Sequence, residues 1–253
     1  MKTNKHDAAD AEACCEAVQR PSMRFVPVKT EAPQATLMLH RVRDQLIGQR
    51  TATINALRGH LAELGMVAAQ RQAGLRQLLA ALGELADERM PWLAREMLQL
   101  LATQIRQLEA QIADLDRRLA AMTRTDPICR SLAAVPGVGP VIATALAVPD
   151  ATVFHSGRHL AAWLGLVRRR HATAGKERRL GISKRGDGYL RRQLIHGARA
   201  LVRISPGRTG KLWSWIGGLR ARRPFNVVVV AVANKLARIL WAMLSRGEAY
   251  RAA

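Results

Sequence analysis

The most restrictive feature of the chain is an apolar repeat that begins at Leu98 and ends at Met122. Large aliphatic residues recur there at alternating steps of three and four. A repeat of this period places its residues along one seam of an α-helix, and a long seam needs a partner helix. The sequence therefore predicts a coiled coil built on Leu98, Leu101, Ile105, Leu108, Ile112, Leu115, Leu119 and Met122.

A second amphipathic stretch, residues 33–65, offers a partner because its aliphatic residues also step by three and four. Folding back onto the seam gives an antiparallel hairpin, whereas pairing with a second molecule would bury the same residues. The sequence leaves both arrangements open. A shorter helix is expected over residues 68–86, before Pro91. We assign residues 31–126 to a coiled-coil hairpin, and expect residues 23–28 to form a short strand or an extended connector.

The net charge of +21 is concentrated in one half of the chain. Residues 127–253 hold 23 Lys and Arg against 4 Asp and Glu, whereas residues 1–126 hold 17 against 15. Such an excess predicts a polyanionic partner, and nucleic acid before a membrane surface, because the cations do not lie opposite one apolar helix face. The most apolar run, residues 225–233, is too short to span a bilayer. No membrane partner is expected.

Composition favours a mainly α fold. Aromatic residues make up only 4% of the chain, and Ala and Leu dominate. Residues 127–253 are predicted to form a compact, basic, all-α domain. The three cysteines fit no metal-ligand spacing, which favours a reduced, cytoplasmic protein.

The basic domain opens with Pro136-Gly137-Val138-Gly139-Pro140 between two apolar runs that are expected to be helical. Two glycines allow a tight turn, and the second helix can then present free N–H groups to a phosphate. This pattern predicts a helix-hairpin-helix. The alternative is a helical hairpin that is buried only for packing.

Twelve Lys and Arg lie between Arg168 and Arg203, against only Glu177 and Asp187. We interpret residues 168–176 as a loop, and expect the small residues there and in residues 181–187 to let a sugar–phosphate chain approach closely. Residues 189–204 are expected to form a helix with arginines on its outer face. The candidate nucleic-acid-binding residues are Gly137, Gly139, Arg168, Arg169, Arg170, Lys176, Lys184, Arg185, Arg191 and Arg192.

Aromatic and histidine residues give weaker signals. Trp163 is expected in the core, and three other tryptophans can either stack on bases or be buried. His155 and His159 are spaced like metal ligands, but no third ligand lies near them in the sequence. The tryptophans that can stack on bases or be buried are Trp213, Trp215 and Trp241.

Several runs together resemble the C-terminal domain of one transposase family: residues 135–140, 161–167, 181–187 and 190–192. The family is that of the DEDD-type insertion-sequence transposases related to the Piv invertases, numbered one hundred and ten, whose members are bridge-RNA-guided recombinases. The resemblance implies cutting and rejoining of DNA strands in transposition. It also implies a structured guide RNA, Mg²⁺, assembly into a homo-oligomer through the coil, and a location at the nucleoid in the bacterial cytoplasm.

Residues 1–30 resemble the end of that family's RuvC-like domain. On spacing alone, Asp7 and Asp10 can hold one divalent ion, or form an acidic first turn that complements a helix dipole. In the family, four acids in the order Asp, Glu, Asp, Asp gather magnesium, and Asp7 and Asp10 match the last two. The first Asp and the Glu would lie upstream of Met1. We therefore interpret residues 1–30 as a remnant of an α/β domain.

The family's nucleophile is a Ser in the small-residue loop before a Gly-Lys pair. Here that stretch contains no Ser, and Thr173 is the nearest hydroxyl. Ser183 is the second candidate, with a role in capping the following turn as its alternative. We expect the truncated chain to be inactive alone. The alternatives are a non-catalytic fragment that joins full-length subunits and a generic helix-hairpin-helix DNA-binding protein of the repair type.

Overall fold

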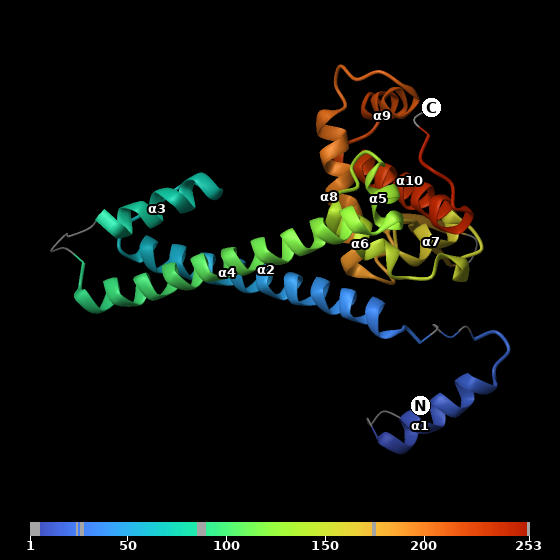
Figure 1. The fold of residues 1–253 in the computed structure, drawn as a ribbon, viewed down its shortest axis with the longest axis horizontal. Coiled ribbons are helices and arrows are strands. Elements are labelled where there is room, and N and C mark those ends of the chain that lie inside the picture. Colours follow the sequence, from blue (N-terminus) through green and yellow to red (C-terminus); the bar gives the residue numbers. More distant parts are fainter. Residues whose placement is uncertain (1–5, 24, 26–27, 85–89, 174–175, 252–253) are drawn as a thin grey trace.

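The computed structural model describes residues 6–23, 25, 28–84, 90–173 and 176–251. Over these residues the chain is mainly helical, as predicted, with one two-stranded sheet (Figure 1). The elements in chain order are α1 (Asp7–Gln19), α2 (Glu31–Glu63), α3 (Gln72–Glu84), α4 (Trp92–Thr125), α5 (Pro127–Ala133), α6 (Pro140–Ala147), the 3-10 helix η1 (Ala151–Val153), α7 (Gly157–Trp163), β1 (Arg168–Thr173), β2 (Lys176–Ile182), α8 (Gly188–Ile204), α9 (Lys211–Arg220) and α10 (Phe225–Arg246).

The predicted helical hairpin is confirmed, because α2 and α4 pack against each other within one chain (Figure 1). Near the far end of the hairpin, Leu57 and Leu61 of α2 are fully buried, and α3 adds a third layer. Five of the eight seam residues of α4 are buried: Leu98, Ile105, Leu108, Ile112 and Leu119. The other three are half-buried. Intramolecular pairing therefore accounts for the seam.

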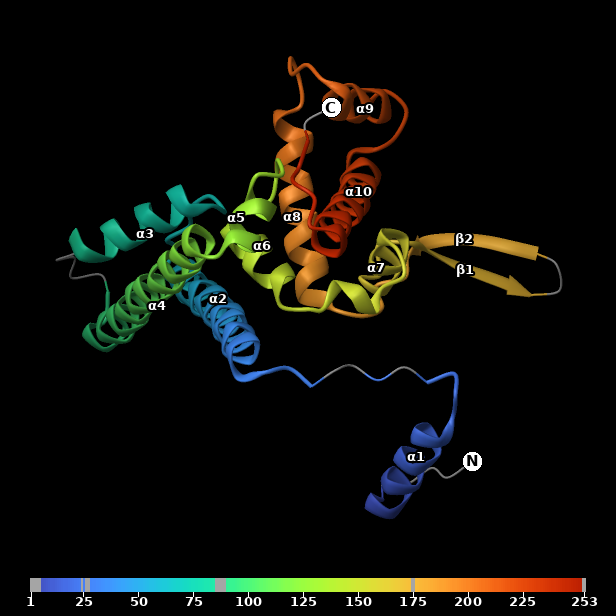
Figure 2. The ribbon, with the colours of Figure 1, turned by 45° about the vertical axis from the view of Figure 1, so that its right-hand side comes forward.

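The N-terminal helix α1 stands apart from the rest of the chain in both views (Figures 1 and 2). None of its residues is buried. The described residues among 23–28 form no strand, so only the extended connector of the two expectations fits them. The interpretation of residues 1–30 as a domain remnant stays a prediction, as do the domain limits.

Helix α10 organises the basic domain, packing against α7, α8 and α9. By length and composition α10 could also cross a membrane. In this fold, however, one of its faces lies in the domain core, where Val228, Val232, Leu236 and Leu240 are buried beside Leu194 of α8. The helix runs to Arg246 and is therefore longer than the apolar run of residues 225–233, which was expected to be too short to span a bilayer.

The basic domain is not wholly helical, which corrects two predictions. A loop was expected over residues 168–176, but residues 168–173 form β1 and Lys176 begins β2 of an antiparallel hairpin, in which Thr173 pairs with Lys176 and Arg170 with Arg179. The hairpin extends away from the helices (Figure 2). A projecting two-stranded ribbon has no face that must be apolar, so the strands lack the alternation by which a half-buried strand is recognised.

Trp163 is a second correction, because its side chain is 37% exposed rather than in the core. It is the last residue of the short helix α7 and packs against the Phe154 ring, with the ring centroids 5.3 Å apart. Position at a helix end leaves one side of the indole open to solvent.

Candidate nucleic-acid interface

A buried histidine joins the coil to the basic domain. His40 of α2 is 2% exposed and lies between Thr144 of α6 and Tyr189 of α8. Its Nε2 is 3.1 Å from the Thr144 Oγ1, and its Nδ1 is 2.9 Å from the Tyr189 hydroxyl. The Thr144 hydroxyl donates to the Pro140 carbonyl at 2.7 Å. One side chain therefore links three helices and fixes the basic domain on the coil.

These contacts define the protonation of His40. Because the Thr144 hydroxyl hydrogen is used on Pro140, its oxygen accepts from the His40 Nε2–H, and Nδ1 then accepts from Tyr189. The imidazole is thus neutral. Burial, and secondarily the nearby Arg43 guanidinium, lowers the pKa of His40 from 6.5 to about 4. Burial also raises the pKa of Tyr189.

Two ion pairs flank His40 on either side. The Arg43 Nε donates to Asp116 Oδ1 of α4 at 2.6 Å, and Arg192 of α8 pairs with Asp44 at 2.7 Å. Arg192 was predicted to bind nucleic acid. Its guanidinium instead lies at the joint, where an acid that is distant in sequence neutralises it.

The two segments that lead into and out of the hairpin are pressed together at its base. A Cβ on Gly186 would lie 1.8 Å from the Trp163 carbonyl oxygen. A Cβ on Gly165 would lie 2.5 Å from the Arg185 carbonyl oxygen. Ser183 N donates to the Val167 carbonyl at 2.8 Å. Both glycines therefore serve close packing within the chain. Gly186 belongs to residues 181–187, where small residues were expected to admit a sugar–phosphate chain.

Arg191 completes this base from α8. Its guanidinium donates to the carbonyls of Leu164 at 3.0 Å and Arg185 at 2.7 Å. Asp187 caps α8 by accepting from Leu190 N at 2.9 Å, so Asp187, not Ser183, caps the helix that follows. Arg191, like Arg192, is thus already engaged within the protein.

The two candidate nucleophiles lie at opposite ends of the hairpin. Thr173 is the last residue of β1, at the tip, and its side chain lies outside the described part. Ser183 directly follows β2 at the base and is half-buried. The two residues therefore lie at separate ends of the hairpin and are alternative candidates.

The other predicted nucleic-acid contacts lie either at the hairpin base, within its strands or at the glycine-rich turn. Four cations are exposed at or next to the hairpin base: Arg168, Arg169, Lys184 and Arg185. Arg170 and Lys176 lie within the strands, and their side chains are outside the description. At the predicted helix-hairpin-helix, short helices α5 and α6 do flank the turn. The motif itself stays a prediction.

The two glycines of that turn differ in their surroundings. Gly137 has a φ of +81°, and a Cβ there would lie 2.7 Å from Leu201 Cγ of α8. The Gly137 carbonyl oxygen would lie 2.1 Å from a Cβ placed on Gly197 of α8. Gly139 has no neighbour within 4 Å of such an atom and is exposed. Gly137 therefore packs on α8, and only Gly139 is placed to meet a ligand.

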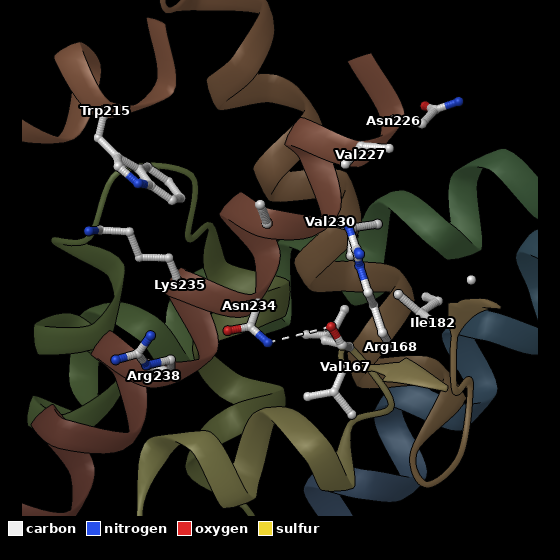
Figure 3. A pocket seen from close by; sticks show the side chains of 13 residues that line it. Val167, Arg168, Ile182, Trp215, Asn226, Val227, Val230, Asn234, Lys235 and Arg238 are labelled. Carbon is white, nitrogen blue, oxygen red and sulfur yellow. Dashed lines mark hydrogen bonds between the residues drawn. The ribbon is translucent and has the colours of Figure 1, made fainter. Parts of the chain in front are cut away.

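A hollow of about 950 Å³ lies beside the hairpin base. Of the residues that line it, Arg168 was a predicted nucleic-acid contact and Trp215 a possible base-stacking residue. Figure 3 shows Lys235 and Arg238 of α10 on one side and Arg168 with Ile182 on the other. A second hollow of about 550 Å³ shares Lys235 and Arg238 and adds Arg158. No Asp or Glu is among the described residues that line either hollow. The i, i+3 spacing of Lys235 and Arg238 was the available sequence signal.

The three tryptophans that could have stacked on bases have partners within the protein. The Trp241 indole N–H donates to the carbonyls of Ala151 at 3.1 Å and Phe154 at 3.0 Å, so Trp241 is structural. Arg208 lies over the Trp213 ring at 5.0 Å, and Lys235 over the Trp215 ring at 4.5 Å. Of these three indoles, Trp215 alone lines the hollow.

The residues present do not complete a metal site. Asp7 and Asp10 lie in the first turn of the exposed helix α1. Within the described ranges no three His, Cys, Asp or Glu side chains gather to hold an ion. The rings of His155 and His159 stack on each other, with centroids 5.5 Å apart. Because Mg²⁺ needs near-octahedral oxygen ligands, two carboxylates do not suffice.

Comparison with known proteins decides the family. The transposase IS116/IS110/IS902 family model matches residues 129–213. A probable family 20 transposase of Pseudomonas aeruginosa is 50% identical over 254 residues, which cover 99% of this chain and 75% of the relative. The chain belongs to this transposase family. The matched region of this family member runs from α5 through the turn, the hairpin and α8 into α9.

Two further relatives cover the same extent. The transposase for insertion sequence element IS1111A of Coxiella burnetii is 41% identical, over 99% of this chain and 70% of the relative. The transposase for insertion sequence element IS1328 of Yersinia enterocolitica is 38% identical, over 99% of this chain and 75% of the relative. The likeness to these relatives therefore includes the coil as well as the basic domain.

Proposed function

We propose that this family member binds insertion-sequence DNA and cuts and rejoins its strands, with the hairpin and its base as the reacting region. One observation carries the proposal: the family match at residues 129–213 spans the part of the chain where exposed cations surround a projecting hairpin. Arg168, Arg169, Lys184 and Arg185 would bind backbone phosphates there.

Thr173 takes the nucleophile position in this proposal. Its hydroxyl oxygen attacks a backbone phosphorus, the bond from phosphorus to the leaving strand oxygen breaks, and the hydroxyl proton passes to solvent or a base. The strand is then held as a phosphothreonine ester. Attack by another strand's hydroxyl on that phosphorus rejoins the DNA and releases Thr173. The hairpin tip is a reasonable place for such a group, because it extends away from the helices (Figure 2).

The proposed assembly uses the coil. Exposed apolar side chains remain on the outside of α4, among them Leu93, Met97 and Leu100. A homo-oligomer that forms through this face would bring two hairpins to one DNA junction. A structured guide RNA, a cytoplasmic, nucleoid-associated location and a requirement for Mg²⁺ follow only from the resemblance. No step above depends on them.

A covalent adduct tests the nucleophile. Incubation with labelled DNA that carries an insertion-sequence end should give a protein–DNA band that resists denaturation and disappears in Thr173→Val, which keeps the shape but lacks the hydroxyl. Ser183→Ala should keep the band. A band that survives Thr173→Val and is lost in Ser183→Ala would move the nucleophile to the hairpin base.

A non-catalytic DNA- or RNA-binding role, through joining or regulating full-length transposase, is the second candidate. The incomplete acid set on α1 favours it, because Asp7 and Asp10 have no third described ligand. In that case the chain binds DNA but forms no adduct. Adding a catalytically competent relative would then show mixed oligomers by size-exclusion chromatography with light scattering.

A further inference from the structure

We propose that the hollow between the hairpin base and α10 holds an unpaired DNA base, with the adjoining phosphates on its cationic rims. The proposal rests on the proposed function and makes it more specific. Duplex DNA exposes phosphates and base edges, but not base faces. An apolar cavity beside cations instead fits a nucleotide whose base has left the stack.

The rims of the hollow supply positive charge from two sides. Arg168 lies at the end of the hairpin, and Lys235 and Arg238 lie on α10 across from it (Figure 3). Arg158 extends the cationic rim into the second hollow. No described carboxylate lines either one. A backbone that passes over the hollow would therefore meet cations before and after the base.

The floor of the hollow is apolar. Val167 and Ile182 come from the hairpin base, and Val227, Val230 and Ala231 come from the outer face of α10. Val227 remains 43% exposed, although it belongs to a helix that is long and apolar enough to cross a membrane. Covering such a surface with the face of a base removes it from water, which favours binding. The volume of about 950 Å³ is within the range of ligand sites.

Asn234 and Trp215 in the hollow could fix the orientation of a bound base. Asn234 is held by donating to the Leu166 carbonyl at 3.4 Å, which leaves its side-chain oxygen for a base edge. Trp215 forms one wall, with the Lys235 ammonium over its ring. We assign the occupant to DNA and not to RNA, because the hollow adjoins the hairpin that would cut the DNA strand.

The test separates base from phosphate by using two probes of equal charge. Fluorescence anisotropy would measure binding of the full chain to an oligothymidine and to an abasic oligonucleotide of the same length. We expect oligothymidine to bind at least tenfold more tightly. Val230→Phe, which fills the hollow without changing charge, should abolish that preference and leave duplex affinity within twofold. Ala231→Leu is a second filling variant, should Val230→Phe not fold.

The control is Ile204→Phe, an equally conservative enlargement of an exposed residue that does not line the hollow. It should keep the full preference for oligothymidine. A preference that persists in both filling variants would overturn the proposal, and so would a filling effect seen with oligouridine but not with oligothymidine. If the parent chain forms no covalent adduct but keeps the preference for oligothymidine, the proposed chemistry fails and the base-binding proposal stands.

Discussion

Two faces of the basic domain carry arginines in similar sequence contexts but use them differently. On the face toward the coil, Arg192 pairs with Asp44 of α2, beside the buried His40. On the face toward the hairpin and α10, Arg185 and Arg238 are exposed and have no described carboxylate partner. A high count of cations therefore does not measure how many of them can bind a phosphate.

The difference follows from where the few acids lie. The coil carries nearly balanced charge, so its acids can neutralise cations of the basic domain at the joint. The hairpin face has no such neighbour among the described residues, and its cations repel one another until a polyanion binds. The joint therefore holds the domain in place, and the cations of the hairpin face stay available to the nucleic acid that we propose as the partner.

The largest expected effect on stability tests whether the glycine-rich turn at residues 136–140 packs against α8. Gly197→Ala would place a methyl group 2.1 Å from the Gly137 carbonyl oxygen and should lower the free energy of unfolding by about 3 kcal/mol. Chemical denaturation measures this change. The control Gly139→Ala has free space at a φ of −91° and should cost less than about 1 kcal/mol. Equal losses would refute the packing role of the turn.

Acid should weaken the joint by a similar amount. The folded pKa of His40, about 4, is below its ordinary 6.5, so the unfolded chain binds the proton more tightly. The stability due to neutral His40 is therefore complete above pH 6.5 and is lost as the pH falls toward 4, by up to about 3 kcal/mol. Arg43 and Tyr189 face the ring and do not titrate there.

Carboxylates also titrate in this range, so His40→Asn is the reference for the acid effect. The difference in unfolding free energy between the parent chain and His40→Asn, measured by urea denaturation at each pH, should shrink from pH 7 to pH 4. A difference that stays constant would mean that His40 is not the group responsible.

A smaller effect is expected at the hairpin base. Arg191→Gln removes charge-assisted hydrogen bonds to the Leu164 and Arg185 carbonyls and should cost about 2 kcal/mol. Arg203→Gln changes an exposed arginine on the same helix and should stay within about 0.5 kcal/mol. If the two variants lose the same unfolding free energy, Arg191 does not hold the hairpin base together.

Periodic packing was predictable from the sequence, and long-range pairing was not. The seam from Leu98 to Met122 indicated α4 and its partner because buried helix faces impose a repeat. The hairpin was missed because a projecting ribbon imposes none. The role of Arg192 was also missed, since its partner Asp44 lies 148 positions away. That of Arg191 was missed because its partners are backbone carbonyls, which any residue supplies. The hollow depends on α10 meeting the hairpin base, which no local pattern records.

The most direct test of the account compares two arginines across a range of salt concentrations. Each variant, Arg185→Gln and Arg192→Gln, would be assayed for duplex DNA affinity from low to physiological salt. Arg185→Gln should reduce the slope of log affinity against log salt by about 0.9, the value for one phosphate contact on B-DNA, whereas Arg192→Gln should leave the slope unchanged. Equal slopes for the two variants, or a parent chain whose affinity does not depend on salt, would contradict the account.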